Sequence, residues 1–370
     1  MTGNKQVIEP NYSFLSLFTG AGGLDLGFET QGFRLLEAVE INPWCVKTLK
    51  QNRPQWKVSP RDIHQYEPNV SESPDVLLAG FPCQGFSLGG KRDESDGRNL
   101  LYQQVLRIAN ITRPKVVVME NVLNLGRMKF PGTNQPFAAK IATELEQLGY
   151  TVIYDIFKVC YYGTPQTRRR FVFIAFQDKP PLGYHLPPPS SSTVIKPFIY
   201  QLGQDTSISL FNHNPMWGFH SRVHVETGEP FSESEEAVPV RLSRTASDGC
   251  PIRSFNSPFP AVDTATVWGW AQGNVRAQRV VKDRSKEKFV RNPNSQVKLW
   301  RIAASRLRSF THREYARLQT FPDDWVFCGA SKRDIQLQIG NAVPVSFAEC
   351  LARNVRLALE AMEKGRDFMD

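Results

Sequence analysis

The sequence predicts an α/β protein built on a doubly wound, mostly parallel sheet, with a smaller and irregular second domain. Residues 1–178 alternate apolar strand signals with helical signals, which is the pattern of βαβ units in a parallel sheet. The strand signals at 75–80 and 115–120 are nearly continuous apolar runs, which indicates strands that are covered on both faces. After residue 178 the alternation stops and turn-forming residues take over.

The strands of the first domain follow from apolar composition and from the turns between them. The expected strands span residues 13–18, 35–40, a short stretch ending at Asp62, 75–80, 115–120, 151–159 and 170–176. The last two are rich in β-branched and aromatic residues, so we expect them to form a final strand pair.

Helices are expected between these strands and near the end of the chain. They span residues 24–31, 43–51, 137–148, 311–320 and 343–362. Gly32 and Gly149 stand where a helix C-cap is expected, and Pro43 stands at a helix start, where proline is favoured.

The chain is expected to divide into three segments: 1–178, 179–330 and 331–370. The proline- and serine-rich run at 187–192 indicates the exit from the first domain. The middle segment has poor periodicity and a basic stretch with two acids, Asp283 and Glu287. Its cationic residues are Arg276, Arg279, Lys282, Arg284, Lys286, Lys288, Arg291, Lys298 and Arg301.

Composition bounds the class of protein. The 370 residues carry 45 Lys and Arg against 36 Asp and Glu, a net charge of +9 that suits a polyanionic partner. No run of eighteen apolar residues and no signal-peptide pattern occurs, so we expect no membrane segment. The six scattered cysteines lack a Cys-x-x-Cys pair, which favours free thiols in a reducing compartment. His220 and His224 have no acid or cysteine suitably placed nearby, so we expect no metal site.

The run Phe18-Thr-Gly-Ala-Gly-Gly23 lies where the first strand turns into the first helix. Glycines there let the backbone approach a ligand, and a helix N-terminus favours polar or anionic groups. Glu40 ends the second strand, where a carboxylate can accept both hydroxyls of a ribose, and Asp62 could accept from an adenine amino group. The alternative is that both acids are surface residues at strand ends.

Cys83 follows an apolar strand in the turn Gly80-Phe-Pro-Cys-Gln-Gly-Phe-Ser87, and Glu120 ends the strand at 115–120. Both therefore belong at the carboxyl edge of the sheet, where α/β enzymes keep their sites. Such a turn favours a lowered thiol pKa, and an apolar crevice favours a raised carboxyl pKa. A thiol and a proton-donating acid in one crevice can attack a ring carbon and hold the ring nitrogens. The alternatives are a buried apolar cysteine and a satisfied buried acid.

The run Gln166-Thr-Arg-Arg-Arg170 opens the last strand. On a period of two, Arg168 and Arg170 share a face and Arg169 points the other way. That face could place guanidinium groups near a bound base or phosphate, whereas a solvated charge run is the alternative.

These residues together resemble the motifs of the DNA (cytosine-5) methyltransferase family, in the family's order along nearly the whole chain. The matching segments are 18–23, Glu40-Ile-Asn, Asp62-Ile, 80–87, Gly97-Arg-Asn-Leu-Leu-Tyr102, Glu120-Asn-Val, 166–170, 308–322 and Gln338-Ile-Gly-Asn-Ala-Val-Pro344. Two positions depart from the pattern: Ile41 replaces a common aromatic residue, and Asn99 replaces a common glycine.

The resemblance implies a Rossmann-like domain that binds S-adenosyl-L-methionine, at 1–178, and a target-recognition domain at 179–330. Segment 331–370 is then expected to return to the first domain. The resemblance implies cofactor contacts by Phe18, Gly20, Gly22, Gly23, Glu40, Asp62, Ile63, Pro82, Leu101, Asn341 and Val343.

The resemblance also implies the reaction. Cys83 would attack carbon 6 of a cytosine flipped out of double-stranded DNA, while Glu120, Arg168 and Arg170 would hold the base. Carbon 5 would then take the methyl group. A compact bacterial enzyme of this kind would lie in the cytoplasm at the nucleoid and would act beside a cognate restriction endonuclease.

Three other functions compete with this one. An RNA (tRNA) cytosine-5 methyltransferase shares the catalytic residues, although the Pro-Cys-Gln-Gly-Phe-Ser turn and the long middle segment favour the DNA branch. A non-catalytic DNA-binding relative would have lost Cys83 or the glycine turn, and both are present. A NAD-dependent dehydrogenase shares the fold but explains neither Pro-Cys-Gln nor Glu-Asn-Val.

Overall fold

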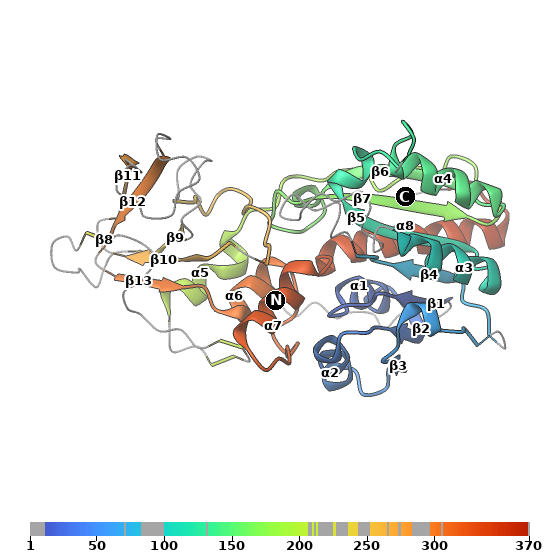
Figure 1. The fold of residues 1–370 in the computed structure, drawn as a ribbon, viewed down its shortest axis with the longest axis horizontal. Helices are drawn as coiled ribbons and strands as arrows, with labels where there is room; N and C mark the ends of the chain where they lie inside the picture. Colours follow the sequence, from blue (N-terminus) through green and yellow to red (C-terminus); the bar gives the residue numbers. More distant parts are fainter. Residues whose placement is uncertain are drawn as a thin grey trace.

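A larger lobe carries the main sheet and a smaller lobe carries two short sheets in the computed structural model (Figure 1). The structure describes residues 12–69, 72–82, 100–130, 132–205, 209–210, 212–213, 225–226, 236–242, 252–264, 266–272, 275–282, 297–304 and 306–368.

The main sheet has seven strands in the order β3-β2-β1-β4-β5-β7-β6. They are β1 (Tyr12–Leu17), β2 (Phe33–Val39), β3 (Val58–Ser59), β4 (Val76–Ala79), β5 (Val116–Val122), β6 (Thr151–Lys158) and β7 (Arg169–Phe176). Strands β1 to β5 pair in parallel, and β7 runs antiparallel to β5 and β6. The predicted doubly wound, mostly parallel sheet is confirmed. The strand order reverses between β1 and β4, which is where such sheets bind ligands.

Helices cover both faces of this sheet. The helices of the larger lobe are α1 (Gly23–Thr30), α2 (Pro43–Asn52), α3 (Tyr102–Thr112), α4 (Phe137–Gln147) and α8 (Val345–Lys364). Neighbouring strand residues divide between the faces: Leu77 packs in a cluster with α3 and α4, and Leu78 packs in a cluster with α1 and α8. Each such side chain stabilises the fold by about 1.5–3 kcal/mol on full burial.

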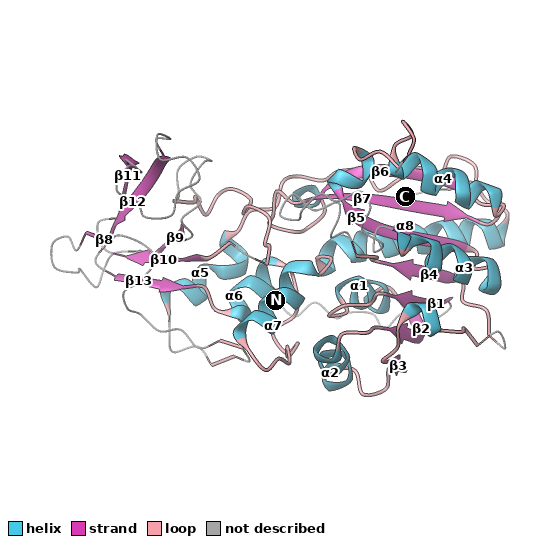
Figure 2. Ribbon diagram, viewed as in Figure 1, coloured by secondary structure: helices cyan, strands magenta, loops and turns pink. Residues whose placement is uncertain are grey.

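Helix α8 brings the end of the chain back onto the larger lobe, behind the sheet in Figure 2. It packs closely on α1, because a Cβ on Gly27 would lie only 2.3 Å from the Cβ of Ala348. The chain that leaves β7 also stays on this lobe: Tyr184 donates to Asn354 of α8 at 2.7 Å and packs edge-on against Phe368.

The smaller lobe is irregular. Its sheets join β9 (Val238–Arg241), β10 (Trp268–Gln272) and β13 (Arg306–Ser309) in one group, and β8 (Val225–Glu226), β11 (Arg276–Lys282) and β12 (Val297–Ala303) in another. Helices α5 (Lys196–Gln204), α6 (His312–Leu318) and α7 (Lys332–Asn341) lie beside or between the lobes.

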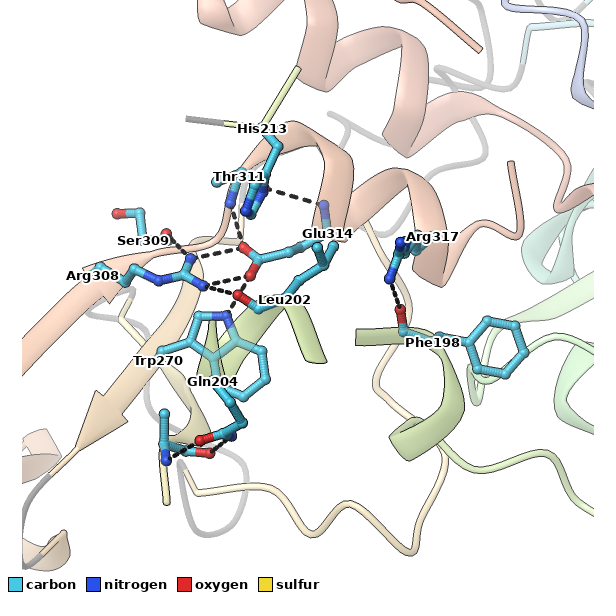
Figure 3. Close-up of polar contacts among 11 residues, drawn as sticks. Phe198, Leu202, Gln204, His213, Trp270, Arg308, Ser309, Thr311, Glu314 and Arg317 are labelled. Carbon is cyan, nitrogen blue, oxygen red and sulfur yellow. Dashed lines mark hydrogen bonds and ion pairs between the residues drawn. The ribbon is translucent and has the colours of Figure 1, made fainter. Parts of the chain in front are cut away.

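One buried carboxylate organises the smaller lobe (Figure 3). Glu314 pairs with Arg308 through contacts of 2.6 and 2.9 Å, and both side chains are fully buried. The same carboxylate accepts from the Trp270 indole at 2.7 Å and from the Thr311 backbone amide at 2.7 Å. Arg308 also donates to the carbonyl of Leu202. Strands β10 and β13 and helices α5 and α6 therefore meet at one charge cluster.

Candidate active site

A cavity opens at the switch point between β1 and β4, bounded by the ends of β1 and β2, the start of α1 and the end of α7. Among the predicted cofactor-binding residues, those that line it are Phe18, Gly20, Gly23, Glu40, Asn341 and Val343. Glu120, predicted to be catalytic, lines the same cavity. Residues from both ends of the chain therefore meet at this edge of the sheet.

The glycine turn fits closely between its neighbours. Gly20 has φ +59°, and a Cβ there would meet no atom within 4 Å, so its surface is open. Gly22 has φ +82°, and its Cβ would lie 2.7 Å from Leu49. A Cβ on Gly23 would lie 2.1 Å from the carbonyl oxygen of Val343. Glycine at 23 is thus what lets the segment after α7 reach the turn.

Glu40 is buried at the end of β2 and is held by two backbone amides. Its Oε2 accepts from the amide of Gly20 at 2.7 Å, and its Oε1 accepts from the amide of Asn42 at 2.7 Å. Burial raises the pKa of Glu40, and these amides partly offset the effect. The carboxylate is therefore fixed beside the glycine turn with lone pairs left for a ligand.

Five of the predicted cofactor contacts are not among the residues that line this cavity: Gly22, Asp62, Ile63, Pro82 and Leu101. Asp62 is half-buried and caps a short 3₁₀ helix (Ile63–Gln65), where its Oδ1 accepts from the His64 amide at 2.9 Å. It lies three residues beyond the end of β3, so the prediction that it ends that strand is wrong. Ile63 is buried in the core cluster, and half-buried Leu101 packs on that cluster at the start of α3. Pro82 is half-buried after β4.

Glu120 is 7 % exposed near the end of β5. Arg170, opposite Val122 on β7, places its Nε 2.5 Å from Glu120 Oε1. Burial raises the pKa of Glu120, and the Arg170 guanidinium acts in the opposite direction. The net rise favours a carboxyl that can donate a proton, as the apolar strand around it led us to expect.

The segment leading toward Cys83 lies beside Glu120. Asn121 donates from Nδ2 to the carbonyl of Phe81 at 3.2 Å, and the Cβ position of Gly80 is 4.0 Å from Glu120 Oε2. Cys83 itself lies outside the described residues.

Arg168 and Arg170 have different surroundings. Arg168 is 4 % exposed and donates from Nη1 to the carbonyls of Val262 at 2.7 Å and Gly340 at 3.0 Å. Strand β7 begins at Arg169, so the period of two that predicts a shared face does not reach Arg168. Its observed contacts join the smaller lobe to α7.

Two buried amides strengthen the same junction, and neither is among the predicted site residues. Gln166 donates to Gln319 Oε1 at 2.8 Å and accepts from the Val262 amide at 2.8 Å. Gln319 in turn donates to the carbonyl of Ile339 at 2.6 Å. Both glutamines lie inside segments that resemble motifs of the family. Their position in those motifs is the sequence signal that could have identified them.

A further missed residue lines the cavity. Asp25 is 1 % exposed in the first turn of α1. Its signal in the sequence was one acid within the apolar helix segment 24–28.

The structure describes only part of the predicted basic stretch and neither of the two histidines considered for a metal site. Strands β11 and β12 carry the two ends of the basic stretch, whereas residues 283–296, His220 and His224 lie outside. Among the described residues, no group of three or more His, Cys, Asp or Glu is placed to hold a metal ion. No helix in the described part of the chain is long and apolar enough to cross a membrane.

Comparisons with known proteins agree with this arrangement. The family model described as "C-5 cytosine-specific DNA methylase" matches residues 12–356. The chain is 31 % identical over 369 residues to the Type II methyltransferase M.PspPI of Psychrobacter sp. (strain TA137), covering 97 % of this chain and 83 % of the relative. It is 30 % identical over 361 residues to the Type II methyltransferase M1.HphI of Haemophilus parahaemolyticus, covering 93 % and 86 %.

A solved structure shows the same fold. It is a protein described as a DNA modification methyltransferase encoded within a prophage (E. coli), with a TM-score of 0.59 and 22 % identity over 95 % of this chain and 100 % of that one. On the family match and the two relatives, the chain belongs to the C-5 cytosine-specific DNA methylase family.

Proposed function

We propose that the protein methylates carbon 5 of a flipped-out cytosine within a specific duplex DNA sequence, as the modification enzyme of a restriction system. The observation that supports this most is the buried Glu120, paired with Arg170 in the cavity that also holds the glycine turn and Glu40. The family is that of S-adenosyl-L-methionine-dependent DNA cytosine methyltransferases, and relatives are named Type II methyltransferases.

The cavity fits the proposed cofactor. S-adenosyl-L-methionine, when bound, supplies an electrophilic methyl group on its sulfonium. Gly20 leaves open space for a ligand against the backbone, and Glu40 presents a fixed carboxylate for the ribose hydroxyls. We assign Asp62 and Ile63 to the adenine end, and Phe18, Asn341 and Val343 to the walls of the cavity.

The target base must leave the duplex before any side chain reaches it, at a cost of roughly a few kcal/mol of unstacking. We assign Cys83 as the nucleophile: its thiolate adds to carbon 6 of the cytosine and forms a carbon–sulfur bond. The electron pair displaced toward carbon 5 then takes the methyl group. Loss of the carbon-5 proton expels the Cys83 thiolate and restores the ring.

Glu120 is assigned to nitrogen 3 of the ring. A protonated carboxyl can donate there while negative charge gathers on the pyrimidine, and burial favours that protonation state. Arg170 orients Glu120 and is assigned to the base oxygen. Arg168 is assigned as a positioning residue, because its observed contacts are the carbonyls of Val262 and Gly340.

The decisive test replaces Cys83 by serine. Wild-type protein, tritiated cofactor and duplex DNA should give methyl incorporation, and Cys83→Ser should reduce it to background because serine is a far weaker nucleophile at neutral pH. Full incorporation by the variant would remove the covalent step from the mechanism.

The same preparations separate the competing functions. Preference for a tRNA substrate over duplex DNA would favour an RNA methyltransferase, and DNA binding without incorporation by wild type would favour a non-catalytic relative. Bisulfite sequencing of DNA from expressing cells reads base, position and context together. Resistance of that DNA to one restriction endonuclease would identify a cognate partner, and co-purification with the nucleoid would test the proposed cytoplasmic location.

A further inference from the structure

Asp25 is a buried acid that the mechanism above does not use. It lies in the first turn of α1, is 1 % exposed and lines the cavity with Gly20, Glu40 and Glu120. Neither carboxyl oxygen has a partner in hydrogen-bond geometry among the described residues, and the nearby Ser16 hydroxyl and Asp25 amide only lower its pKa without completing a bond. Native proteins rarely bury a polar group without a hydrogen bond, so a bound ligand is the expected partner of this carboxyl.

The charged groups that act on Asp25 are acids. Glu40 approaches from the end of β2 and Glu29 from the same helix, and Glu29 is itself paired with Arg53 at 2.7 Å. Burial, together with these acids, raises the pKa of Asp25 to about 7, although the Ser16 hydroxyl and the residue's own amide work in the other direction. Cys45, which lines the cavity from α2, stays a neutral thiol because burial raises its pKa, so it adds no charge near Asp25.

An occupant that satisfies this carboxyl must be cationic and must donate hydrogen bonds. S-adenosyl-L-methionine carries two positive groups, but its sulfonium has no hydrogen to donate. Its α-ammonium has three N–H donors, which can bond to the two carboxylate oxygens of Asp25.

We propose that the Asp25 carboxylate receives the α-ammonium group of S-adenosyl-L-methionine. The proposal rests on the proposed cofactor site and adds a contact at its amino-acid end. Asp25 should therefore strengthen the binding of ligands that carry the amino-acid group of the cofactor. It should not affect the binding of 5′-methylthioadenosine, which lacks that group.

Cofactor binding should depend on pH, because burial raises the pKa of Asp25. At neutral pH a share of Asp25 is protonated, and the ammonium selects the ionised form, so binding releases a proton. Affinity for the cofactor should therefore rise as pH increases from about 6 to about 7.5, below the range in which an α-amino group itself loses its proton.

The test is isothermal titration calorimetry with three probes: S-adenosyl-L-methionine, S-adenosyl-L-homocysteine and 5′-methylthioadenosine, which lacks the amino-acid group. Asp25→Asn should weaken the first two by roughly tenfold or more, the range of a charge-assisted hydrogen bond, and should leave the third within about twofold. Equal loss for all three probes, loss confined to the sulfonium ligand, or no loss would each overturn the proposal.

Two further measurements complete the design. Glu40→Gln should weaken all three probes, and if it weakens none, the proposed cofactor site fails rather than the role of Asp25. The second measurement titrates wild-type protein with S-adenosyl-L-methionine in buffers of different ionisation enthalpy. The dependence of the binding enthalpy on the buffer gives the number of protons released on binding, and no substitution is needed. Proton release near pH 6.5 supports the proposal, and its absence contradicts it.

Discussion

At the scale of single residues, the cavity uses burial to give two carboxyls different tasks. Glu40 is fixed by two backbone amides and keeps lone pairs for a ligand, whereas Glu120 faces one guanidinium. Burial raises the pKa of both. The neighbouring donors, rather than the residue type, decide which carboxyl accepts from a ligand and which is suited to donate.

Arg170 should set the pH range over which Glu120 works. Glu120 acts in its protonated form, so the rate falls as pH rises through its pKa. Arg170 favours the ionised form, and Arg170→Met should therefore raise that pKa and move the alkaline limb of the pH–kcat profile to higher pH. Single-turnover rates across pH measure the shift.

The exposed neighbour Arg169 gives a matched control, because Arg169→Met removes the same charge at the other face of the strand. The control should leave the alkaline limb in place. An unmoved limb in Arg170→Met would mean that Glu120 is not the titrating donor.

At the scale of elements, the junction between β7, α6 and α7 connects the smaller lobe to the cavity. Gln319 bonds to the carbonyls of Ile339 and Ala342, which immediately flank the stretch that brings Asn341 to the cavity wall. The structure thus gives the end of α7 a fixed position through side-chain amides from a distant part of the chain.

Gln319→Ala should leave these buried carbonyls without their donor. We expect the free energy of unfolding to fall by about 1–3 kcal/mol and cofactor binding to weaken. Urea denaturation and calorimetry measure the two effects. Gln336→Ala is the control, since half-buried Gln336 makes a bond of 2.9 Å to the Asp263 carbonyl that is exposed to solvent, and its loss should cost no more than about 0.5 kcal/mol. Equal losses in both variants would count against a special role for the junction.

Removing one partner of the buried pair Arg308–Glu314 should strongly destabilise the smaller lobe. Arg308→Leu leaves the Glu314 carboxylate buried without its cation, which should cost about 3–5 kcal/mol. Its counterpart Arg356→Leu breaks a partly exposed pair with Glu360 and should cost below about 1 kcal/mol. Chemical denaturation compares them, and similar losses in the two variants would refute the assignment.

At the scale of the whole molecule, an apolar cluster joins the lobes. Trp56 and Leu49 from the larger lobe share it with Trp325, Phe321 and Ile339. Figure 2 shows the arrowhead of β4 pointing toward the smaller lobe, so the carboxyl edge of the parallel strands and the smaller lobe face one another. We propose that the smaller lobe binds the duplex DNA, which would then present its flipped base to the cavity.

The net charge of +9 acts at the scale of the whole molecule, because the contributions of separate contacts with DNA phosphates to the binding free energy add together. Replacing Lys282 of β11 and Lys298 of β12 by glutamine should reduce the slope of log affinity against log salt by up to about 1.8, at roughly 0.9 per lost phosphate contact. Fluorescence anisotropy with duplex DNA measures the slope. Lys364→Gln, at the end of α8, should leave it unchanged, and a fall of the same size there would show a non-specific charge effect.

Much of the larger lobe was predictable because its signals are local. Apolar runs and glycine or proline boundaries indicated six of the seven strands and helices α1, α2, α4 and α8 within one or two residues of their observed ends, whereas β3 ends at Ser59, three residues before the predicted end at Asp62. Helix α3 was missed although Val105, Ile108, Ala109 and Thr112 carry a helical spacing and are buried. Helices α5 and α7 were missed as well, since short amphipathic segments next to turns give a weaker periodic signal.

The sequence by itself determined the strand-to-helix turn at 18–23, the acids at the strand ends and the family, because each depends on neighbouring residues or on their order. Tertiary structure decided what no local pattern encodes. It directed Arg168 to carbonyls 94 and 172 residues away, and it enclosed Asp25 among acids without a hydrogen-bond partner in the described residues. Such contacts arise only when distant segments pack, and packing sets the burial on which each side chain's pKa and hydrogen bonding depend.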